Sequence, residues 1–167
     1  NLDKTSLIID YLNFKKKRKT LITLIGNYEK NKGLNLSEAS IREKDNLVLF
    51  KNLFLNQNNK IIKFDKINLD YFDIEGKKNQ LSFQRKQKND YELKGLLLNA
   101  NTIISDLLKN KNDKKNKIFK NDINLTLNIK EVFIDSENIL NNIKGNLIIK
   151  DNKIFQTNVS AFFGNNE

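Results

Sequence analysis

The chain has 167 residues, the size of one domain, and its composition excludes several kinds of active site. It contains no His, Cys, Met, Trp or Pro, so thiolate nucleophiles, imidazole bases, disulfides and the usual zinc, haem and iron–sulfur sites are excluded. We expect no catalytic residue, no metal and no cofactor. Because the chain begins at Asn1 and lacks Met, we expect it to be an internal piece of a longer protein.

The net charge is +10, which raises the question of nucleic acid or an anionic membrane surface as a partner. However, 27 of the 30 cations are Lys and Asn occurs 29 times, a bias that an AT-rich coding sequence produces whatever the function. The basic runs at residues 15–19 and 109–117 are interpreted as solvated surface. We therefore expect no nucleic-acid partner. No apolar run approaches the roughly 18 to 20 residues of a membrane-spanning helix, so any anchor is expected outside this piece.

In the first 90 residues, apolar and polar residues alternate with a period of two, which is typical of half-buried β-strands. Turns rich in Asn, Asp and Gly at residues 31–33, 56–59, 76–79 and 88–90 accept the positive φ of tight hairpins. We expect residues 1–90 to be the strand-rich N-terminal part of an antiparallel sheet. In chain order, the alternating residues are Leu34 and Leu36, Leu47 and Leu49, Ile67 with Leu69 and Tyr71, and Leu81 with Phe83.

The alternation continues in a strand around Tyr91 and Leu93 and then changes. In residues 101–108 the apolar residues fall at i, i+1, i+4 and i+5, which predicts one short helix near 101–110 with Asn101 or Thr102 as its N-cap. Residues 109–121 are rich in Lys and Asn and poor in apolar residues, so we expect a flexible loop there.

The clearest alternation lies in the last 45 residues. Residues 123–129 and 155–163 alternate, and a turn signal at 151–153 precedes the second of these strands. Around residues 136–142, a second short turn of helix is an alternative to a strand. Gly95, Gly145 and Gly164 are interpreted as bulges or close approaches of backbone.

A sheet with one apolar face must bury it against a second layer, close into a barrel, or hold something apolar. The sequence offers no set of long amphipathic helices for a second layer. We expect a mainly β fold, an antiparallel meander that forms a curved, open sheet. A closed sandwich or barrel stays open as the alternative.

Residues 91–167 carry a family resemblance. The strand, Gly95 and short helix of residues 91–108 come first, followed after a variable loop by the strand 123–129, the Gly-led segment 145–149 and the small-aromatic-Gly ending at 159–164. In order and spacing these segments resemble AsmA-like proteins of the YhdP and TamB type. Asn99 stands where that family often has Asp.

The resemblance implies a periplasmic β-groove, anchored in the inner membrane of a double-membraned bacterium, that carries phospholipid toward the outer membrane without catalysis. The implied partners are phospholipid acyl chains and the inner membrane, through an anchor outside this piece. Each buried methylene contributes about 0.8 kcal/mol, and such non-directional contact lets a lipid slide. We expect the acyl chains to contact Leu125, Leu127, Ile129, Leu147, Ile149, Val159, Ala161 and Phe163.

Two other functions stay open. A basic all-β module that binds nucleic acid or another polyanion predicts cations converging on one face, with Tyr71, Phe72, Phe83 and Tyr91 as the aromatic residues that would stack on bases. A structural β-sandwich predicts a closed core. The carboxylates Asp70, Asp73 and Asp135 have no phosphate loop, nucleophile elbow or metal-ligand cluster beside them, so we do not expect an enzyme.

Overall fold

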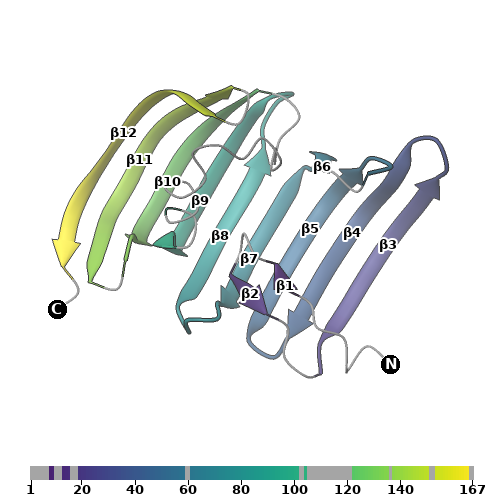
Figure 1. Ribbon diagram of the computed structural model, residues 1–167, viewed down its shortest axis with the longest axis horizontal. Coiled ribbons are helices and arrows are strands. Elements are labelled where there is room, and N and C mark those ends of the chain that lie inside the picture. The colour runs from purple at the N-terminus through teal and green to yellow at the C-terminus, as the bar shows by residue number, and fades with distance from the viewer. Residues whose placement is uncertain are drawn as a thin grey trace.

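The computed structural model describes residues 8–9, 13–15, 19–58, 61–101, 104, 122–135, 137–150 and 153–165, nearly all of them in β-strands. Ten strands form one large sheet, and β1 and β2 form a separate two-stranded sheet (Figure 1). The strands are β1 (Ile8–Ile9), β2 (Phe14–Lys15), β3 (Leu21–Glu29), β4 (Gly33–Glu43), β5 (Asn46–Leu55), β6 (Ile61–Lys63), β7 (Lys66–Phe72), β8 (Lys78–Arg85), β9 (Asp90–Asn99), β10 (Ile123–Phe133), β11 (Asn138–Lys150) and β12 (Lys153–Asn165).

The large sheet is open, with β3 at one end and β12 at the other, and its strands curve along their length (Figure 1). The strand order is β12-β11-β10-β9-β8-β7-β5-β4-β3, and β6 pairs with β5 beside β7. The predicted mainly β, open sheet is confirmed. Strands from both sides of residue 90 belong to it, because β8 and β9 pair directly.

One pair of neighbours departs from the predicted meander. β9 and β10 are parallel, whereas the other neighbours are antiparallel. A parallel pair needs a crossover connection, and residues 100–122 make it. Most of the predicted helix near 101–110 and all of the predicted loop 109–121 lie outside the described residues. Within the described part, the Ile104 amide donates to the Ala100 carbonyl at 2.8 Å.

The predicted turns at 31–33, 76–79 and 88–90 lie where consecutive strands of the sheet meet. Parts of the turns at 56–59 and 151–153 fall outside the described residues. The helical turn suggested around 136–142 is wrong, because residues 138–142 begin β11. There Ile139 and Leu140 pair with β10 on one side and β12 on the other, so tertiary pairing determines their conformation.

The core lies on one face of the sheet, near its centre. Val48 and Tyr71 are buried in a cluster that also contains Phe14 of the small β1–β2 sheet and Ala100. The Phe14 ring meets the Tyr71 ring edge-on, with centroids 5.6 Å apart. In Figure 1 the small sheet overlies β7 on the near side, and the Ile74 amide donates to the Asn13 carbonyl at 2.9 Å. Phe14 therefore covers the middle of this face.

A buried polar network fixes the turn between β7 and β8 against the end of β9. The Asp73 carboxylate accepts hydrogen bonds from Asn99 Nδ2 at 2.8 Å, Asn79 Nδ2 at 3.3 Å and the Lys77 amide at 2.9 Å. The side-chain oxygen Oδ1 of Asn79 in turn accepts a hydrogen bond from the backbone N–H of Asn99 at 2.8 Å. Because Asp73, Asn79 and Asn99 are all buried, each needs these partners.

Replacing Asp73 by Ala is expected to destabilise the chain by about 1–3 kcal/mol, because Asn79 and Asn99 each lose one of the two acceptors of their buried side-chain amide groups and the Lys77 amide loses its carboxylate acceptor. Urea unfolding followed by circular dichroism measures this. The exposed Asn128→Ala variant is the control and should stay within about 0.5 kcal/mol of the parent chain. Equal stability of the two variants would contradict the role given to the network.

Gly95 marks a close approach between β8 and β9. A Cβ atom at this position would lie 2.4 Å from Leu81 Cδ2 and 2.5 Å from the Gln80 carbonyl oxygen. The register between the two strands shifts at the same point, between Gln80 and Leu81. The interpretation of Gly95 as a close-approach position is therefore confirmed.

Gly95→Ala is expected to destabilise the fold by about 1–3 kcal/mol, because the new methyl group must displace backbone as well as the Leu81 side chain. Gly164→Ala is the matched control, since the nearest atom there is Nδ2 of the Asn141 side chain, which can move. Thermal unfolding of both variants tests this, and an equal shift in the two melting temperatures would refute it.

Candidate functional site

The register of the large sheet builds two rows of apolar residues that cross it from strand to strand. Neighbours within a row are direct cross-strand partners, so their side chains share one face. We call this the apolar face. The first row crosses eight strands and consists of Ile22, Ile41, Val48, Leu69, Leu81, Gly95, Ile129 and Ile143. The second crosses nine and consists of Leu24, Ala39, Phe50, Ile67, Phe83, Leu93, Leu127, Gly145 and Val159.

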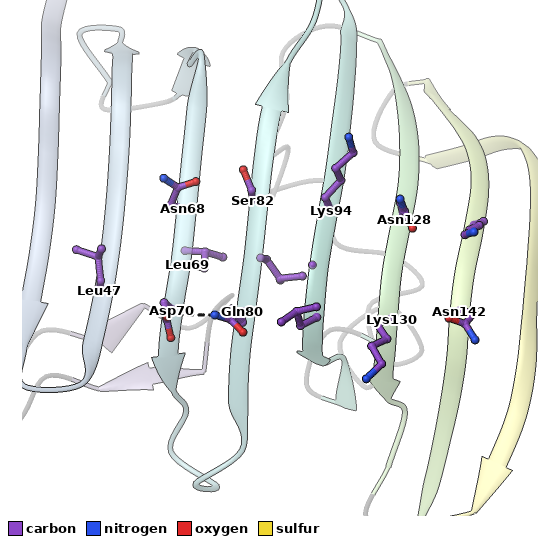
Figure 2. Close-up of a pocket in the computed structure, with 14 residues that line it drawn as sticks. Leu47, Asn68, Leu69, Asp70, Gln80, Ser82, Lys94, Asn128, Lys130 and Asn142 are labelled. Carbon is purple, nitrogen blue, oxygen red and sulfur yellow. Dashed lines mark hydrogen bonds between the residues drawn. The ribbon is translucent and has the colours of Figure 1, made fainter.

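The opposite side, which we call the polar face, carries cross-strand rows made mostly of polar residues. One of them crosses the same nine strands as Thr23, Ser40, Leu49, Asn68, Ser82, Lys94, Asn128, Lys144 and Ser160. Figure 2 shows Asn68, Ser82, Lys94 and Asn128 side by side on successive strands. The sheet is therefore amphipathic over its middle strands, whereas the end strands β3 and β12 carry exposed apolar side chains on both faces, such as Ile25 and Phe162 on the polar one.

A shallow depression lies on the polar face, over the middle strands (Figure 2). Its lining is mixed, with the carboxylate of Asp70, the amide of Gln80 and the ammonium groups of Lys94 and Lys130. Gln80 Nε2 donates to Asp70 Oδ2 at 3.4 Å. The side chains of Leu47, Leu69, Leu81 and Leu96 also line it, so the depression combines apolar and charged groups.

Cations of the polar face are matched by nearby carboxylates. Lys51 pairs with Glu38 on the neighbouring strand, and Lys78 pairs with Asp70. Glu92 accepts from both Lys86 and Lys94, each at 2.8 Å. Lys94, Lys130 and Lys144 lie together around the depression, and Lys94 and Lys130 each contact a carboxylate, Glu92 and Glu131. These ion pairs reduce the positive charge that a polyanion would meet there.

Burial on the apolar face falls from the centre of the sheet toward both ends. At the centre, Val48 has no exposed surface and Ile129 is 3% exposed. At the ends, Leu24 on β3 is 64% exposed and Phe163 on β12 is 66% exposed. The face is thus closed by the chain's own residues in the middle and open to solvent at β3 and β12.

The structure brings the eight expected lipid-contacting residues to β10, β11 and β12, where direct pairing links Leu125 with Leu147 and Leu140 with Phe163. Leu125 and Ile129 are buried, Leu127, Leu147 and Ile149 are half-buried, and Val159, Ala161 and Phe163 are exposed. Contact with lipid at these positions stays a prediction.

Sequence reasoning missed the N-terminal half of the apolar face. Ile22, Leu24 and Ile41 extend the same rows to β3. Their alternation is visible in the sequence, but a register shift between Ile25 and Gly26 and the positive φ of Asn52 (49°) interrupt it. A reading that tolerated one extra residue per strand would have found them.

The carboxylates considered for acid–base chemistry hold turns and ion pairs together. Asp135 accepts hydrogen bonds from the Glu137 and Asn138 amides, each at 2.8 Å, and thereby caps the turn between β10 and β11. The bonds from the Asn138 side chain and from both amides lower the pKa of Asp135. Within the described ranges, no group of three or more acidic or other ligating residues is placed to hold a metal ion.

The aromatic residues proposed as a stacking platform lie within the protein. Phe64, Phe83 and Tyr91 pack against one another with ring centroids 5.0 to 5.3 Å apart. Burial raises the pKa of Tyr91, and burial followed by the charge of Asp73 raises that of Tyr71. Phe72 is the exception, since it is exposed, and Lys78 Nζ lies 4.6 Å from its ring centroid.

No protein-family model, no curated protein and no solved structure matches this chain. The resemblance of residues 91–167 to AsmA-like proteins therefore stays a prediction from the sequence. Among the described residues, no helix has both the length and the apolar character to span a membrane.

Stability is expected to decline in acid. Hydrogen bonds from Lys86 and Lys94 lower the pKa of Glu92, as those at Asp135 lower its pKa, so folding favours both charged forms. The ordinary pKa values of these carboxyl groups are 4.5 for Glu92 and 3.8 for Asp135. Above those pH values both carboxylates stabilise the folded chain fully, and this stabilisation is lost as the pH falls through their lower pKa values in the folded state. The free energy of unfolding, measured in urea from pH 7 to 3, should fall below about pH 4.5.

Glu92→Gln should be less stable than the parent at pH 7 and should show a shallower decline in acid. The Lys86→Ala/Lys94→Ala double variant removes the cause of the lowered pKa and should behave in the same way. An acid decline in Glu92→Gln as steep as that of the parent chain would contradict this account.

Proposed function

We propose that the chain is a non-catalytic lipid-carrying segment, in which phospholipid acyl chains lie against the apolar face while head groups stay in solvent. In this proposal it belongs to a periplasmic protein that is anchored in the inner membrane and moves phospholipid between the inner and outer membranes. The location and the direction rest on the resemblance of residues 91–167 to AsmA-like proteins. The chemistry of the occupant rests on the apolar face itself.

The observation that carries the proposal is the second apolar row, which crosses nine of the ten strands of a sheet that does not close. With strands about 4.8 Å apart, nine strands give a row of roughly 38 Å. Successive positions along the row are Ala, Gly or larger apolar residues, so the row offers an acyl chain no polar side chain, although its accessibility falls from the ends to the centre. Such contacts are non-directional and favour movement along the row over fixation at one site.

Burial at the centre of the face sets a condition on this movement. Phe14 packs in the same cluster as Val48 and Leu69, and Ile104 packs against that cluster. An acyl chain can meet the exposed ends of the face at β3 and β12 without displacing these side chains. Phe64 packs against the second row itself, with its ring centroid 5.0 Å from that of Phe83. Passage along the whole row therefore requires both Phe14 and Phe64 to move aside.

The polyanion alternative has less support from the described residues. Its requirement is a set of cations that converge and lack partners, whereas Lys51, Lys78 and Lys94 each have a carboxylate in contact. The closed-sandwich alternative requires a second layer over the apolar face, and the exposure of Leu24, Val159 and Phe163 is inconsistent with such a layer at the ends.

A photo-crosslinking amino acid tests the proposal when it is placed at Leu127 or Val159 on the apolar face. The purified chain is illuminated with vesicles of phosphatidylethanolamine and phosphatidylglycerol, and adducts are identified by mass spectrometry. We expect phospholipid adducts from both positions. The matched controls are the adjacent residues Asn128 and Asn158, whose side chains lie on the polar face and should give few adducts.

Equal adduct yields from the two faces, or protein-only adducts at Leu127 and Val159, would refute lipid carriage. Binding of an oligonucleotide that weakens steeply as salt is raised, with crosslinks at Asn128, would instead support the polyanion alternative.

A further inference from the structure

Two aromatic side chains cover the centre of the apolar face, and they are held there in different ways. Phe64 lies between β6 and β7 of the large sheet, where the adjacent Asp65 amide donates to the Lys51 carbonyl at 3.1 Å. The Asp65 carbonyl accepts from the Arg85 amide at 2.8 Å, so backbone bonds on both sides hold this segment in the sheet. Phe14 lies in β2, which pairs with β1 in a separate two-stranded sheet. Phe14 can therefore leave the apolar face without breaking the strand pairing of the large sheet, whereas displacement of Phe64 breaks it.

The small sheet of β1 and β2, which we call the cover, has two residues in each strand. A two-stranded ribbon by itself is marginally stable at best in water, so its position depends on docking against the large sheet. The docking contacts include the Phe14 ring against Tyr71 and the bond from the Ile74 amide to the Asn13 carbonyl at 2.9 Å. Within β2, Phe14 is buried and Lys15 is exposed. Phe14 is therefore the side chain by which β2 is anchored.

The side chains beneath the cover are suited to an acyl chain. Val48 on β5 and Leu69 on β7 are direct cross-strand partners in the middle of the first apolar row, and both belong to the same buried cluster as Phe14. An acyl chain reaches them only when the cover is displaced, and it then replaces the apolar contacts that the Phe14 ring makes. A ligand shifts an equilibrium between two conformations when it makes contacts in only one of them. Lipid therefore favours the displaced cover.

We infer that the cover is displaceable and that a phospholipid acyl chain takes the place of Phe14 over Val48 and Leu69. In the structure, which contains no lipid, the Phe14 ring occupies this position. Displacement opens the centre of the first apolar row, while Phe64 continues to cover the second row. The inference rests on the proposed function, because that function supplies the lipid that displaces the cover.

Distances between pairs of spin labels test the inference, because the chain contains no Cys of its own. Lys15→Cys carries the label on the cover, and Asn128→Cys, which is exposed on the polar face, carries the reference label in the large sheet. The matched control pairs Lys63→Cys with the same reference, because Lys63 is exposed and precedes Phe64 in the chain, as Lys15 follows Phe14.

Each labelled pair is measured by pulsed electron paramagnetic resonance, with and without vesicles of phosphatidylethanolamine and phosphatidylglycerol. We expect the vesicles to add a second, longer distance for the Lys15 pair and to leave the distance of the Lys63 pair unchanged. An equal change in both pairs would overturn the inference, because it would mean that the large sheet itself is altered.

Phe14→Ala removes the anchor and should produce the longer distance for the Lys15 pair without vesicles. Phe163→Ala, which truncates an exposed aromatic residue on β12, is the matched control and should not. The circular dichroism spectrum checks that both variants keep the large sheet, and the vesicle experiment does not depend on either of them.

The failure of this inference is distinguishable from the failure of the proposed function. Lipid adducts at Leu127 and Val159 together with an unchanged distance for the Lys15 pair would overturn the displaceable cover and leave lipid carriage standing. The absence of adducts together with an unchanged distance would overturn both.

Discussion

Cross-strand register in the ten-stranded sheet is the constraint on which the rest of the structure depends. Among the described residues, Phe14 and Phe64 pack on the centre of the apolar face, and each strand must turn its apolar side chains toward this face to reach them. A slip of one residue would exchange the apolar and polar sets of a strand. Here eight successive pairings keep Leu24, Ile67 and Val159 on the same face, although these residues are far apart in the chain. Gly145 preserves this register by allowing close approach, since a Cβ atom there would lie 2.0 Å from the Asn158 carbonyl oxygen.

Stability and exposure are divided between different parts of this sheet. Full burial of a large apolar side chain contributes about 1.5–3 kcal/mol, and the fully buried examples, Phe14, Val48 and Phe64, belong to the central clusters. The end strands depend more on backbone pairing, and regions with few buried contacts open most readily. A ligand that meets the face at β3 or β12 therefore leaves the main stabilising contacts in place.

The sequence predicts the strands best where alternation is unbroken, as in residues 123–129, and least where an extra residue enters a strand. Asn142 has a positive φ of 52°, and the register with β12 shifts beside it, so the start of β11 has no period of two and resembled a helical turn. The turn between β4 and β5 has no Gly, because Lys44 itself adopts a φ of 40°. The parallel pairing of β9 and β10 follows from the length of the connection at residues 100–122, a signal that was present but was not used.

Coverage at the centre of the apolar face decides where an acyl chain can bind. Phe14 packs in one cluster with Val48 and Leu69, and the ring centroid of Phe64 lies 5.0 Å from that of Phe83, so the chain's own side chains cover both apolar rows there. The second row ends at Leu24 and Val159, which are 64% and 40% exposed. A ligand can therefore bind at either end of the row without displacing the core, whereas movement from one end to the other requires the aromatic side chains to move aside. The barrier to carriage along the face thus lies at its centre, where burial stabilises the fold most.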